Sequence, residues 1–231
     1  MPEVLEKALT VAEKKRPDVL RINEIFYSIQ GEGSRSGDRC IFIRLTGCGL
    51  RCTYCDTEYA FYEGEDRSVK NVLDEIHAYD CKLVELTGGE PLEQEAAFGL
   101  MKSLCDEGYE VMVETGGHID ISRVDPRVKR IVDLKTPSSG MSARNLYKNI
   151  DYLQMTDEVK FVIGDRHDYL WSKEKITSFD LAAKVGTILM SPVTDILAPD
   201  DLAKWILEDR LPVRFQVQLH KIIWPGVERG V

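Results

Sequence analysis

Residues 41–57 read Ile-Phe-Ile-Arg-Leu-Thr-Gly-Cys-Gly-Leu-Arg-Cys-Thr-Tyr-Cys-Asp-Thr, an apolar run that leads directly into a loop holding three cysteines. The run predicts a buried strand over 40–46. The spacing Cys48-x-x-x-Cys52-x-x-Cys55 then places three thiolates on one short loop. In a chain of this length, such a triplet indicates a metal site rather than a secreted disulfide framework.

The same apolar signal recurs along the chain. Further strands are expected over 21–29, 82–87, 109–114, 130–135, 158–163, 185–190 and 213–219. Helices are expected over 69–76, 96–104, 165–176 and 200–208. This alternation of strand, loop and helix is typical of an α/β fold whose parallel sheet is covered by helices.

Unusual residues follow several of the predicted strands. Gly88-Gly89-Glu90-Pro91, Gly116-Gly117 and Thr136-Pro137-Ser138 each come after one, as the cysteine loop does. In a barrel of parallel strands these loops open on one face, where ligands bind. Helices are short or absent after the strands at 109–114 and 130–135, so a full eight-fold barrel does not fit. We expect an incomplete, partial TIM-type parallel β/α barrel.

Length and composition predict one domain that spans residues 1–231. A chain of 231 residues with 43% hydrophobic side chains can form one sizeable core. Residues 1–18 are expected to form an N-terminal extension whose amphipathic pattern ends at Pro17. The formal net charge of -9 argues against broad attraction to nucleic acid or to an anionic membrane, and favours a small ligand. Because no apolar run reaches the length of a bilayer span and no signal-peptide pattern is present, we expect a cytoplasmic protein.

Three cysteine ligands leave part of a metal centre open. Iron–sulfur clusters are usually held by four cysteines, so a site with three leaves one iron free for a ligand that is not protein. Structural zinc is an alternative that would need one more ligand, for example His118 or Cys81. A ferredoxin-like electron carrier is another, but it should show a fourth cysteine in the usual spacing. Buried, inert thiols are expected at Cys40, Cys81 and Cys105, which lie in strand or helix patterns.

The cysteine loop resembles a known signature. Cys48-Gly-Leu-Arg-Cys52-Thr-Tyr-Cys55 is similar to that of the radical S-adenosylmethionine (SAM) superfamily. The resemblance implies that the three cysteines hold a 4Fe-4S cluster and that the amino acid end of SAM chelates the fourth iron. The reduced cluster of such enzymes cleaves SAM to a 5'-deoxyadenosyl radical, while the protein supplies position and shielding from water.

Two further loops look like cofactor-binding segments of that superfamily. Thr87-Gly-Gly-Glu-Pro91 resembles the segment whose exposed backbone meets the methionine amino group, a contact that a side chain would block. The segment 133–138 looks like the one that reaches the ribose and the carboxylate of SAM. The resemblance assigns the cofactor to Tyr54, Asp56, Gly88, Gly89, Asp133, Lys135, Thr136, Pro137 and Ser138.

Most of the chain resembles one family, the 7-carboxy-7-deazaguanine synthases, which serve the pathway to deazapurine nucleosides such as queuosine. The likeness runs through Tyr27-Ser-Ile-Gln-Gly-Glu-Gly33, Phe42-Ile-Arg-Leu-Thr-Gly-Cys48, Cys55-Asp-Thr57, Glu114-Thr-Gly-Gly117, Lys135-Thr-Pro-Ser-Ser139 and Gln218-Leu-His-Lys221. It implies a carbon–nitrogen lyase that converts 6-carboxy-5,6,7,8-tetrahydropterin to 7-carboxy-7-deazaguanine by a radical ring contraction with loss of ammonia. It assigns the substrate to Ile29, Gln30, Gly31, Glu32, Arg44, Thr87 and His220.

The chemistry of these residue types suits that substrate. The guanidinium of Arg44 can bind a carboxylate through two parallel hydrogen bonds. Gln30 and Glu32 can complement the donor and acceptor edge of a pterin ring, and Gly31 lets the backbone approach the ring. By composition alone, the stretch from Gln30 to Gly33 would instead be a solvated turn.

Thr57 directly follows Cys55-Asp56, and the family is similar in using a threonine at this place to help hold a magnesium ion with the substrate. Magnesium prefers hard oxygen ligands and keeps several waters, so one hydroxyl with substrate oxygens suits it. The alternative is that Thr57 only caps the turn after Asp56.

The family likeness also implies partners. It suggests a homodimer and a reducing electron donor such as flavodoxin. In some members of the family the chain ends close to the active site, whereas here residues 226–231 continue past Pro225. Two other functions stay open at this point: a glycyl-radical enzyme activating enzyme, and a non-enzymatic metal-binding module.

Overall fold

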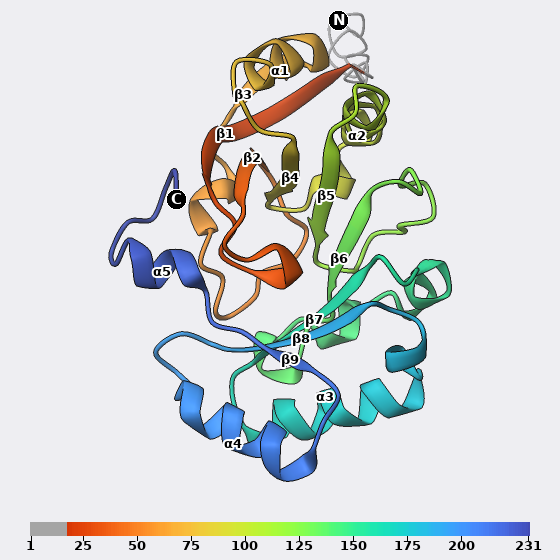
Figure 1. Cartoon of the computed structure of the whole chain (residues 1–231), viewed down its shortest axis with the longest axis vertical. Helices are drawn as coiled ribbons and strands as arrows, with labels where there is room; N and C mark the ends of the chain where they lie inside the picture. The colour runs from red at the N-terminus through yellow and green to blue at the C-terminus, as the bar shows by residue number, and fades with distance from the viewer. Residues whose placement is uncertain (1–17) are drawn as a thin grey trace, which may run out of the picture.

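The computed structural model describes residues 18–231, so the amphipathic pattern expected at the start of the chain lies outside the described residues. The fold is built on a 9-stranded sheet with the order β3-β1-β2-β4-β5-β6-β7-β8-β9. The strands are β1 (Val19–Ile29), β2 (Arg39–Leu45), β3 (Glu65–Ser68), β4 (Leu83–Gly88), β5 (Glu110–Thr115), β6 (Lys129–Asp133), β7 (Glu158–Ile163), β8 (Thr187–Pro192) and β9 (Arg214–Phe215). The sheet curves without closing, because β3 and β9 stand at its two edges (Figure 1).

Strand directions divide the sheet into a parallel part and an antiparallel edge. From β2 through β4 to β9 each strand is parallel to the next. This arrangement confirms the predicted incomplete parallel barrel. Strand β1 is antiparallel to both β2 and β3. Only a short loop joins β1 to β2, and a connection of that length cannot cross over to make a parallel neighbour.

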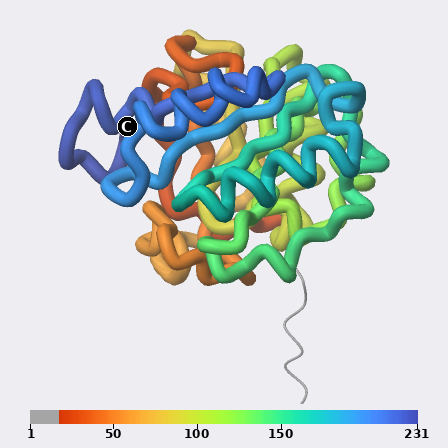
Figure 2. Tube along the Cα trace, turned by 90° about the horizontal axis from the view of Figure 1, so that it is seen from below, coloured from red at the N-terminus to blue at the C-terminus, as the bar shows by residue number. Residues whose placement is uncertain are grey.

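Helices cover the outside of the sheet. They are α1 (Val69–Ile76), α2 (Glu95–Asp106), α3 (Arg166–Ser178) and α4 (Pro199–Asp209). A fifth helix, α5 (Leu219–Ile223), follows β9 and lies beside the loop after β1. The 3-10 turns are at Gly33–Arg35, Glu58–Phe61, Pro91–Glu93, Pro137–Ser139, Ser142–Arg144, Tyr147–Tyr152 and Leu181–Ala183. Helices α3 and α4 lie side by side (Figures 1 and 2), and the hydroxyl of Tyr169 donates to the carbonyl of Trp205 at 2.9 Å. Within the described part of the chain, no α-helix lies between β5 and β6 or between β6 and β7, as the sequence predicts.

Alternating side chains divide each strand between the two sides of the sheet. The outer side packs beneath the helices and includes the fully buried Leu86, Val113 and Phe161. A separate, smaller apolar cluster lies on the other side and consists of Phe26, Cys40, Phe42, Leu83, Met112 and Ile131. This inner cluster closes the barrel at one end.

The inner side becomes polar toward the carboxyl ends of the strands. Two residues after Phe42, Leu83, Met112 and Ile131, the same side carries Arg44, Glu85, Glu114 and Asp133. All four polar residues line one cavity. Because side chains alternate with a period of two, the inner side of the sheet carries the apolar cluster first and, two residues further along each strand, the polar residues that form the floor of the cavity.

Two parts of the secondary structure differ from the expectations. The strand expected over 213–219 is reduced to β9, because the chain then leaves the sheet and Leu219 N donates to the Gly31 carbonyl at 3.0 Å. Strand β3 has the sequence Glu-Asp-Arg-Ser, which contains no apolar residue and gives no strand signal.

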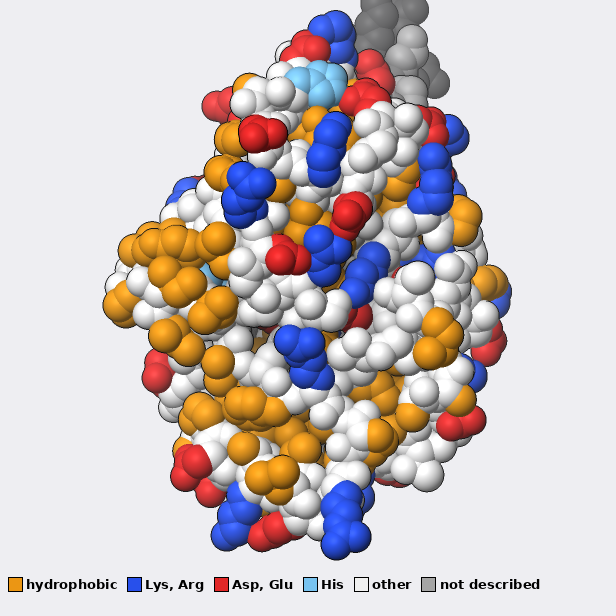
Figure 3. Space-filling model, in the orientation of Figure 1, with side chains coloured by type: hydrophobic (Ala, Val, Ile, Leu, Met, Phe, Trp, Pro, Cys, Tyr) orange, Lys and Arg blue, Asp and Glu red, His pale blue; other side chains and the backbone are white. Residues whose placement is uncertain are grey.

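Apolar side chains gather on the surface near the C-terminal segment. Figure 3 shows them where Figure 1 places α5, and the exposed residues there include Ile222, Ile223 and Val227. Within residues 18–231, no helix combines the length and apolarity that a membrane span requires.

Candidate active site

A cavity of about 920 Å³ lies at the carboxyl ends of the parallel strands. It receives the cysteine loop after β2, the double glycine after β4, and the ends of β5 and β6. Every residue that the sequence assigns to metal, cofactor or substrate lines it, except Thr136, Pro137 and Ser138. The residues thus brought together are Ile29, Gln30, Gly31, Glu32, Arg44, Cys48, Cys52, Tyr54, Cys55, Asp56, Thr57, Thr87, Gly88, Gly89, Asp133, Lys135 and His220.

Two of these exceptions, Thr136 and Ser138, contact the cysteine loop, as does the following Ser139. Thr53 N donates to the Ser139 carbonyl at 3.1 Å, and Thr53 Oγ1 donates to the Ser138 carbonyl at 2.7 Å. The hydroxyls of Tyr54 and Thr136 are 3.1 Å apart. These contacts fix the loop against the turn after β6.

The cysteines fit an iron–sulfur cluster better than a single ion. In a zinc site the sulfurs lie only ~4 Å apart, because each is about 2.3 Å from the same metal. Among residues 18–231, the group of three His, Cys, Asp or Glu ligand atoms that all lie within 4.8 Å of one another belongs to Asp165, His167 and Asp168, so the three cysteine sulfurs do not all lie that close together. A cluster tolerates wider spacing, since each thiolate binds its own iron.

The fourth ligands considered for zinc are occupied elsewhere. His118 Nε2 lies within hydrogen-bond distance of Glu93 Oε1, at 3.0 Å. Cys81 precedes β4 and hydrogen-bonds the Arg39 carbonyl, at the strand end opposite to Gly88. Burial raises the pKa of the Cys48 thiol to about 11 and also raises the pKa of Cys52. Metal binding would release these protons, because the thiolate is the ligand.

The double glycine after β4 is required by the chain's own packing. A Cβ on Gly89 would overlap the carbonyl oxygen of Gly47, and one on Gly88 would overlap the backbone of Leu45. Gly89 N donates to the Leu45 carbonyl at 3.0 Å, and Glu90 N donates to the Gly47 carbonyl at 2.7 Å. The sequence interpretation gave only access to the cofactor as the reason for these glycines. The structure adds close contact with the cysteine loop.

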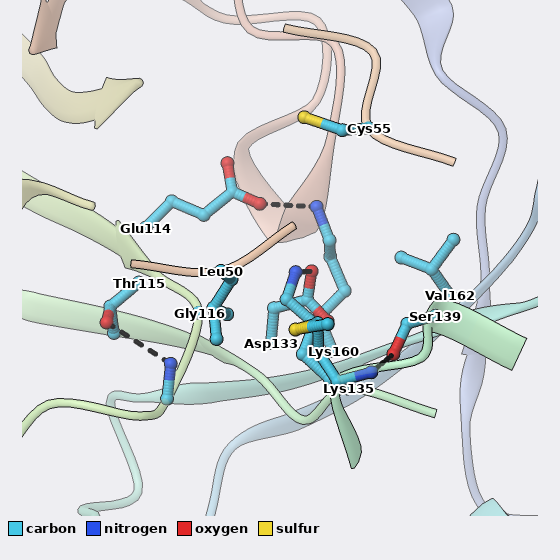
Figure 4. Close-up of polar contacts among 12 residues, drawn as sticks. Leu50, Cys55, Glu114, Thr115, Gly116, Asp133, Lys135, Ser139, Lys160 and Val162 are labelled. Carbon is cyan, nitrogen blue, oxygen red and sulfur yellow. Dashed lines mark hydrogen bonds and ion pairs between the residues drawn. The ribbon is translucent and has the colours of Figure 1, made fainter. Parts of the chain in front are cut away.

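Asp133 and Lys135 form a polar pair on the cavity wall. Lys135 Nζ lies 2.6 Å from Asp133 Oδ2 (Figure 4). Burial acts to lower the pKa of Lys135, but the Asp133 carboxylate outweighs it, so the pKa is raised and the ammonium stays charged. Oδ1 of Asp133 is buried without a hydrogen-bond partner among the described residues. An acceptor of this kind on the cavity wall fits a ligand that brings hydroxyl donors, such as a ribose.

Arg44 projects from β2 into the opposite part of the cavity. Its Nε donates to Oε1 of Glu24 at 2.7 Å, and its guanidinium lies over the rings of Phe26 and Tyr59. Its Nη groups have no hydrogen-bond partner among residues 18–231. They are therefore open to a carboxylate from the cavity.

Gln30 is oriented by the protein itself. Its Nε2 donates to Glu85 Oε2 at 2.5 Å, and its Oε1 accepts from Glu32 N at 3.0 Å. Gly31 is needed because a Cβ there would overlap the ring of His220. Gln30 and Gly31 thus shape the position of Glu32 and His220, in addition to lining the cavity.

Glu32 lies at the centre of contacts that the sequence interpretation missed. It accepts from Gln216 Nε2 at 3.1 Å and from Gln218 Nε2 at 2.9 Å, and it pairs with Lys160. Among the cavity residues, the sequence interpretation missed Glu85 and Lys160, and it assigned no role to Glu114, Gln218 and Lys221, although these three stand in segments that carry the family likeness. The available signal was a charge inside an otherwise apolar strand, such as Glu85 between Val84 and Leu86 or Lys160 between Val159 and Phe161.

Asp56 and Thr57 lie at the end of the cysteine loop. Asp56 Oδ2 accepts from Gln218 at 3.0 Å and from Lys221 at 3.2 Å. Burial acts to raise the pKa of Asp56, but these partners outweigh it and bring the pKa to about 2. Thr57 makes no capping hydrogen bond with its side chain, and its hydroxyl lies 3.8 Å from the Cys55 sulfur. The capping alternative for Thr57 is therefore wrong.

The C-terminal segment lies against the mouth of the cavity. Trp224 to Glu228 and Val231 line it. The Tyr59 hydroxyl donates to the Glu228 carbonyl at 3.2 Å, and Gly230 N donates to Glu24 Oε2 at 3.2 Å. Residues past Pro225 thus contact Tyr59 and Glu24, which also contact Arg44.

Comparisons with family models, curated proteins and solved structures all identify the same kind of relative. Residues 42–174 match the Radical SAM superfamily. The 7-carboxy-7-deazaguanine synthase of Chlorobaculum tepidum is 47% identical over 216 residues, which cover 92% of this chain and 97% of that protein. The 7-carboxy-7-deazaguanine synthase of Koribacter versatilis is 41% identical over 226 residues, with 92% and 100% covered. The crystal structure of QueE from Escherichia coli has the same fold, with a TM-score of 0.71 at 23% identity over 86% of this chain and 94% of that chain.

Proposed function

The chain belongs to the 7-carboxy-7-deazaguanine synthase family of the radical SAM superfamily, and from this membership we propose that it converts 6-carboxy-5,6,7,8-tetrahydropterin to 7-carboxy-7-deazaguanine. The reaction is a ring contraction with loss of ammonia, as expected of a radical lyase in deazapurine (queuosine) biosynthesis.

One observation carries the proposal. The three cysteines, the Asp133 to Lys135 wall and Arg44 all line the same cavity of about 920 Å³. A cluster, SAM and a bicyclic substrate can therefore meet in one space, which radical transfer requires because reacting groups must be in contact.

The cofactor half of the proposal rests on three groups of residues. Cys48, Cys52 and Cys55 would hold the 4Fe-4S cluster, and Asp133 would accept from the ribose hydroxyls through its unpartnered Oδ1. Bound together, cluster and SAM supply a carbon radical that abstracts hydrogen. The protein would hold the cluster and SAM in place, because the hydrogen bonds of Gly89 and Thr53 fix the loops that line this side of the cavity.

The substrate half rests on the opposite wall. The Nη groups of Arg44 would bind the substrate carboxylate through two hydrogen bonds. Glu32 and Glu114 offer carboxylate oxygens to the N–H groups of the pterin ring, and His220 lines the same region. Burial lowers the pKa of His220, so its ring is neutral at physiological pH.

Thr57 would contact a magnesium ion that also binds substrate oxygens. Its hydroxyl lines the cavity and is not used in capping the following turn, which supports this assignment. The ion would take most of its other ligands from water and substrate.

The partners are proposed from family likeness and the surface. The exposed apolar side chains of Ile222, Ile223 and Val227 support a homodimer, because monomers rarely expose such a concentration. A reducing donor such as flavodoxin would supply the electron. The net charge of -9 is consistent with a cytoplasmic protein that binds neither nucleic acid nor membrane.

A glycyl-radical activating enzyme is the enzymatic alternative. It would have to admit a polypeptide loop, whereas this cavity has a floor of charged residues and the segment 224–228 at its mouth. A non-enzymatic metal-binding module would have no use for the charged residues that line the floor of this cavity.

Anaerobic, reconstituted protein incubated with SAM, a reductant, magnesium and the carboxytetrahydropterin should yield the deazaguanine acid, detected by mass. Omission of SAM is the control. Cleavage of SAM without the product, in the presence of the pterin, would contradict the proposed substrate.

A further inference from the structure

We propose that Lys160 is a positioning residue of the substrate site, whose ammonium holds the carboxylates of Glu32 and Glu114 together so that both face the N–H groups of the pterin ring. The inference rests on the proposed function, because it names the ring as the ligand of this pair.

The geometry places one cation between two carboxylates. Lys160 projects from β7, and its Nζ lies 2.8 Å from Glu32 Oε2. It also donates to Glu114 Oε1 (Figure 4). The side chains of Lys160, Glu32 and Glu114 are 8%, 18% and 26% exposed, so the lysine lies deepest and the carboxylates reach the cavity.

Neighbouring side chains fix the rotation of both carboxylates. Gln218 Nε2 donates to Glu32 Oε1 at 2.9 Å, so both oxygens of Glu32 are oriented. Thr87 Oγ1 donates to Glu114 Oε2 at 3.4 Å, so both oxygens of Glu114 are oriented as well. Two carboxylate oxygens accept about four hydrogen bonds. Glu32 also accepts from Gln216 and so has three donors, whereas Glu114 has two, and each carboxylate therefore keeps acceptor capacity for a ligand.

The region around Glu32 and Glu114 is rich in acidic groups, so a cation is needed to hold the two carboxylates close together. The titratable and charged groups that face the pair are Asp56 on the cysteine loop, Glu85 on β4, Asp133 on β6, and His220 and Lys221 on α5. Burial and the nearby Glu114 and Glu32 raise the pKa of Glu85 well above its usual value, and Glu85 Oε2 accepts a hydrogen bond from Gln30. Lys160 is therefore the cation that directly contacts Glu32 and Glu114.

Removing that cation should change how the carboxylates titrate. Burial raises the pKa of Glu114, and the Lys160 ammonium opposes this rise. Burial also acts to raise the pKa of Glu32, but Lys160 outweighs it and the pKa is lowered. Without the ammonium both pKa values rise, and the site takes up a proton as the pH falls. A protonated carboxyl group accepts ring N–H groups less well than a carboxylate does.

The experiment is a fluorescence titration of reconstituted, SAM-loaded protein with 6-carboxypterin, an oxidised analogue that has the same carboxylate and ring edge. Wild type should bind it with a Kd that is nearly constant from about pH 6 to about pH 8. Lys160→Met should weaken binding about 10- to 100-fold at neutral pH and should weaken it further as the pH falls. Lys160→Arg should retain more affinity because it keeps the charge.

Lys129→Met is the matched control. Lys129 lies on β6, and its Nζ is 2.6 Å from Oε1 of Glu158 on β7; neither residue lines the cavity. This variant should keep the wild-type Kd and pH profile. Affinity for SAM should stay within about twofold in every variant, because the lysine acts on the substrate half.

The result that overturns the inference is a Lys160→Met protein with wild-type affinity, or with a loss of affinity that does not depend on pH. If Lys160→Met does not fold, the double variant Lys160→Met/Glu114→Gln is tested in its place, because it removes one positive and one negative charge together. Wild-type affinity in that double variant would equally overturn the inference. If wild type itself neither binds 6-carboxypterin nor turns over the tetrahydropterin, the proposed function fails and the inference fails with it. Wild-type turnover with a Lys160 variant that behaves like Lys129→Met would refute the inference alone.

Discussion

Arg44 and Glu24 form an ion pair between β2 and β1, with Nε of the arginine 2.7 Å from Oε1 of the glutamate. The pair turns the guanidinium so that Nε is used within the protein and the Nη groups stay without a partner among the described residues. A carboxylate in the cavity can then bind to the same guanidinium without breaking the pair.

Arg44→Lys should therefore damage turnover much more than SAM cleavage without substrate. Lysine keeps the charge but loses the planar fork, and a lost charge-assisted hydrogen bond costs about 10- to 100-fold in kcat/KM. Product formation and uncoupled SAM cleavage are measured on the same preparation. Arg39→Lys, at the exposed start of β2, is the matched control and should change neither. Equal loss of both activities in Arg44→Lys would assign the residue to cluster or cofactor support.

Gly89→Ala should weaken the cysteine loop. The added Cβ would overlap the Gly47 carbonyl oxygen, and overpacking of this kind costs about 1–3 kcal/mol. We expect lower thermal stability and lower iron content after reconstitution. Gly99→Ala is the control: it lies in α2 with nothing near the added Cβ, and alanine there should stabilise the helix by roughly 0.5–1 kcal/mol. A Gly89→Ala protein as stable as Gly99→Ala would show that the two loops can separate.

Cys48→Ala, Cys52→Ala and Cys55→Ala should each lose the cluster, whereas Cys105→Ala should keep it. The first three line the cavity, while Cys105 lies on α2 outside it. Iron and sulfide content and the visible absorption of anaerobic protein measure the outcome. Loss of iron in Cys105→Ala as complete as in Cys52→Ala would make the ligand assignment wrong.

Thr57→Ala should keep the cluster and still cleave SAM slowly, but it should lose most of the stimulation that added magnesium gives wild type. The hydroxyl has no structural hydrogen bond in the turn that it precedes, so its removal should cost little stability. Turnover measured against magnesium concentration compares the two proteins, and Thr57→Ser should retain more of the response. A magnesium curve identical to that of wild type would remove Thr57 from the metal site.

The sequence predicts the cofactor half of the site well for a physical reason. Its residues stand in loops directly after apolar strands, and the carboxyl ends of parallel strands meet on one face. The strand pattern alone therefore predicts that the cysteine loop, Gly88-Gly89 and Thr136-Pro137-Ser138 lie on one face, and the first two line the cavity. Asp133 also lines it, but its assignment came only from the family resemblance.

The rest could not be predicted because it depends on pairing across the sheet. Glu85 and Lys160 lie within apolar strands, where a charge indicates a buried polar site but does not identify its partner. The close contact of Gly31 with His220 depends on a chain path that strand propensity does not give, since the strand expected over 213–219 ends early. Strand propensity cannot predict that the backbone after β9 forms hydrogen bonds with the loop that holds Glu32 in place of hydrogen bonds with the sheet.

Glu32 and Gln218, joined at 2.9 Å, are 186 positions apart in the chain. The cysteine loop, the double glycine that packs against it, and the turn at Ser138 and Ser139 that holds it are all synthesised before β7 begins. The wall that faces the substrate is complete only when the last strand and α5 have emerged from the ribosome. A nascent chain can therefore form the cluster loop before it has a pocket for the pterin, and a shortened chain that keeps its iron would still lack the contacts that orient Glu32.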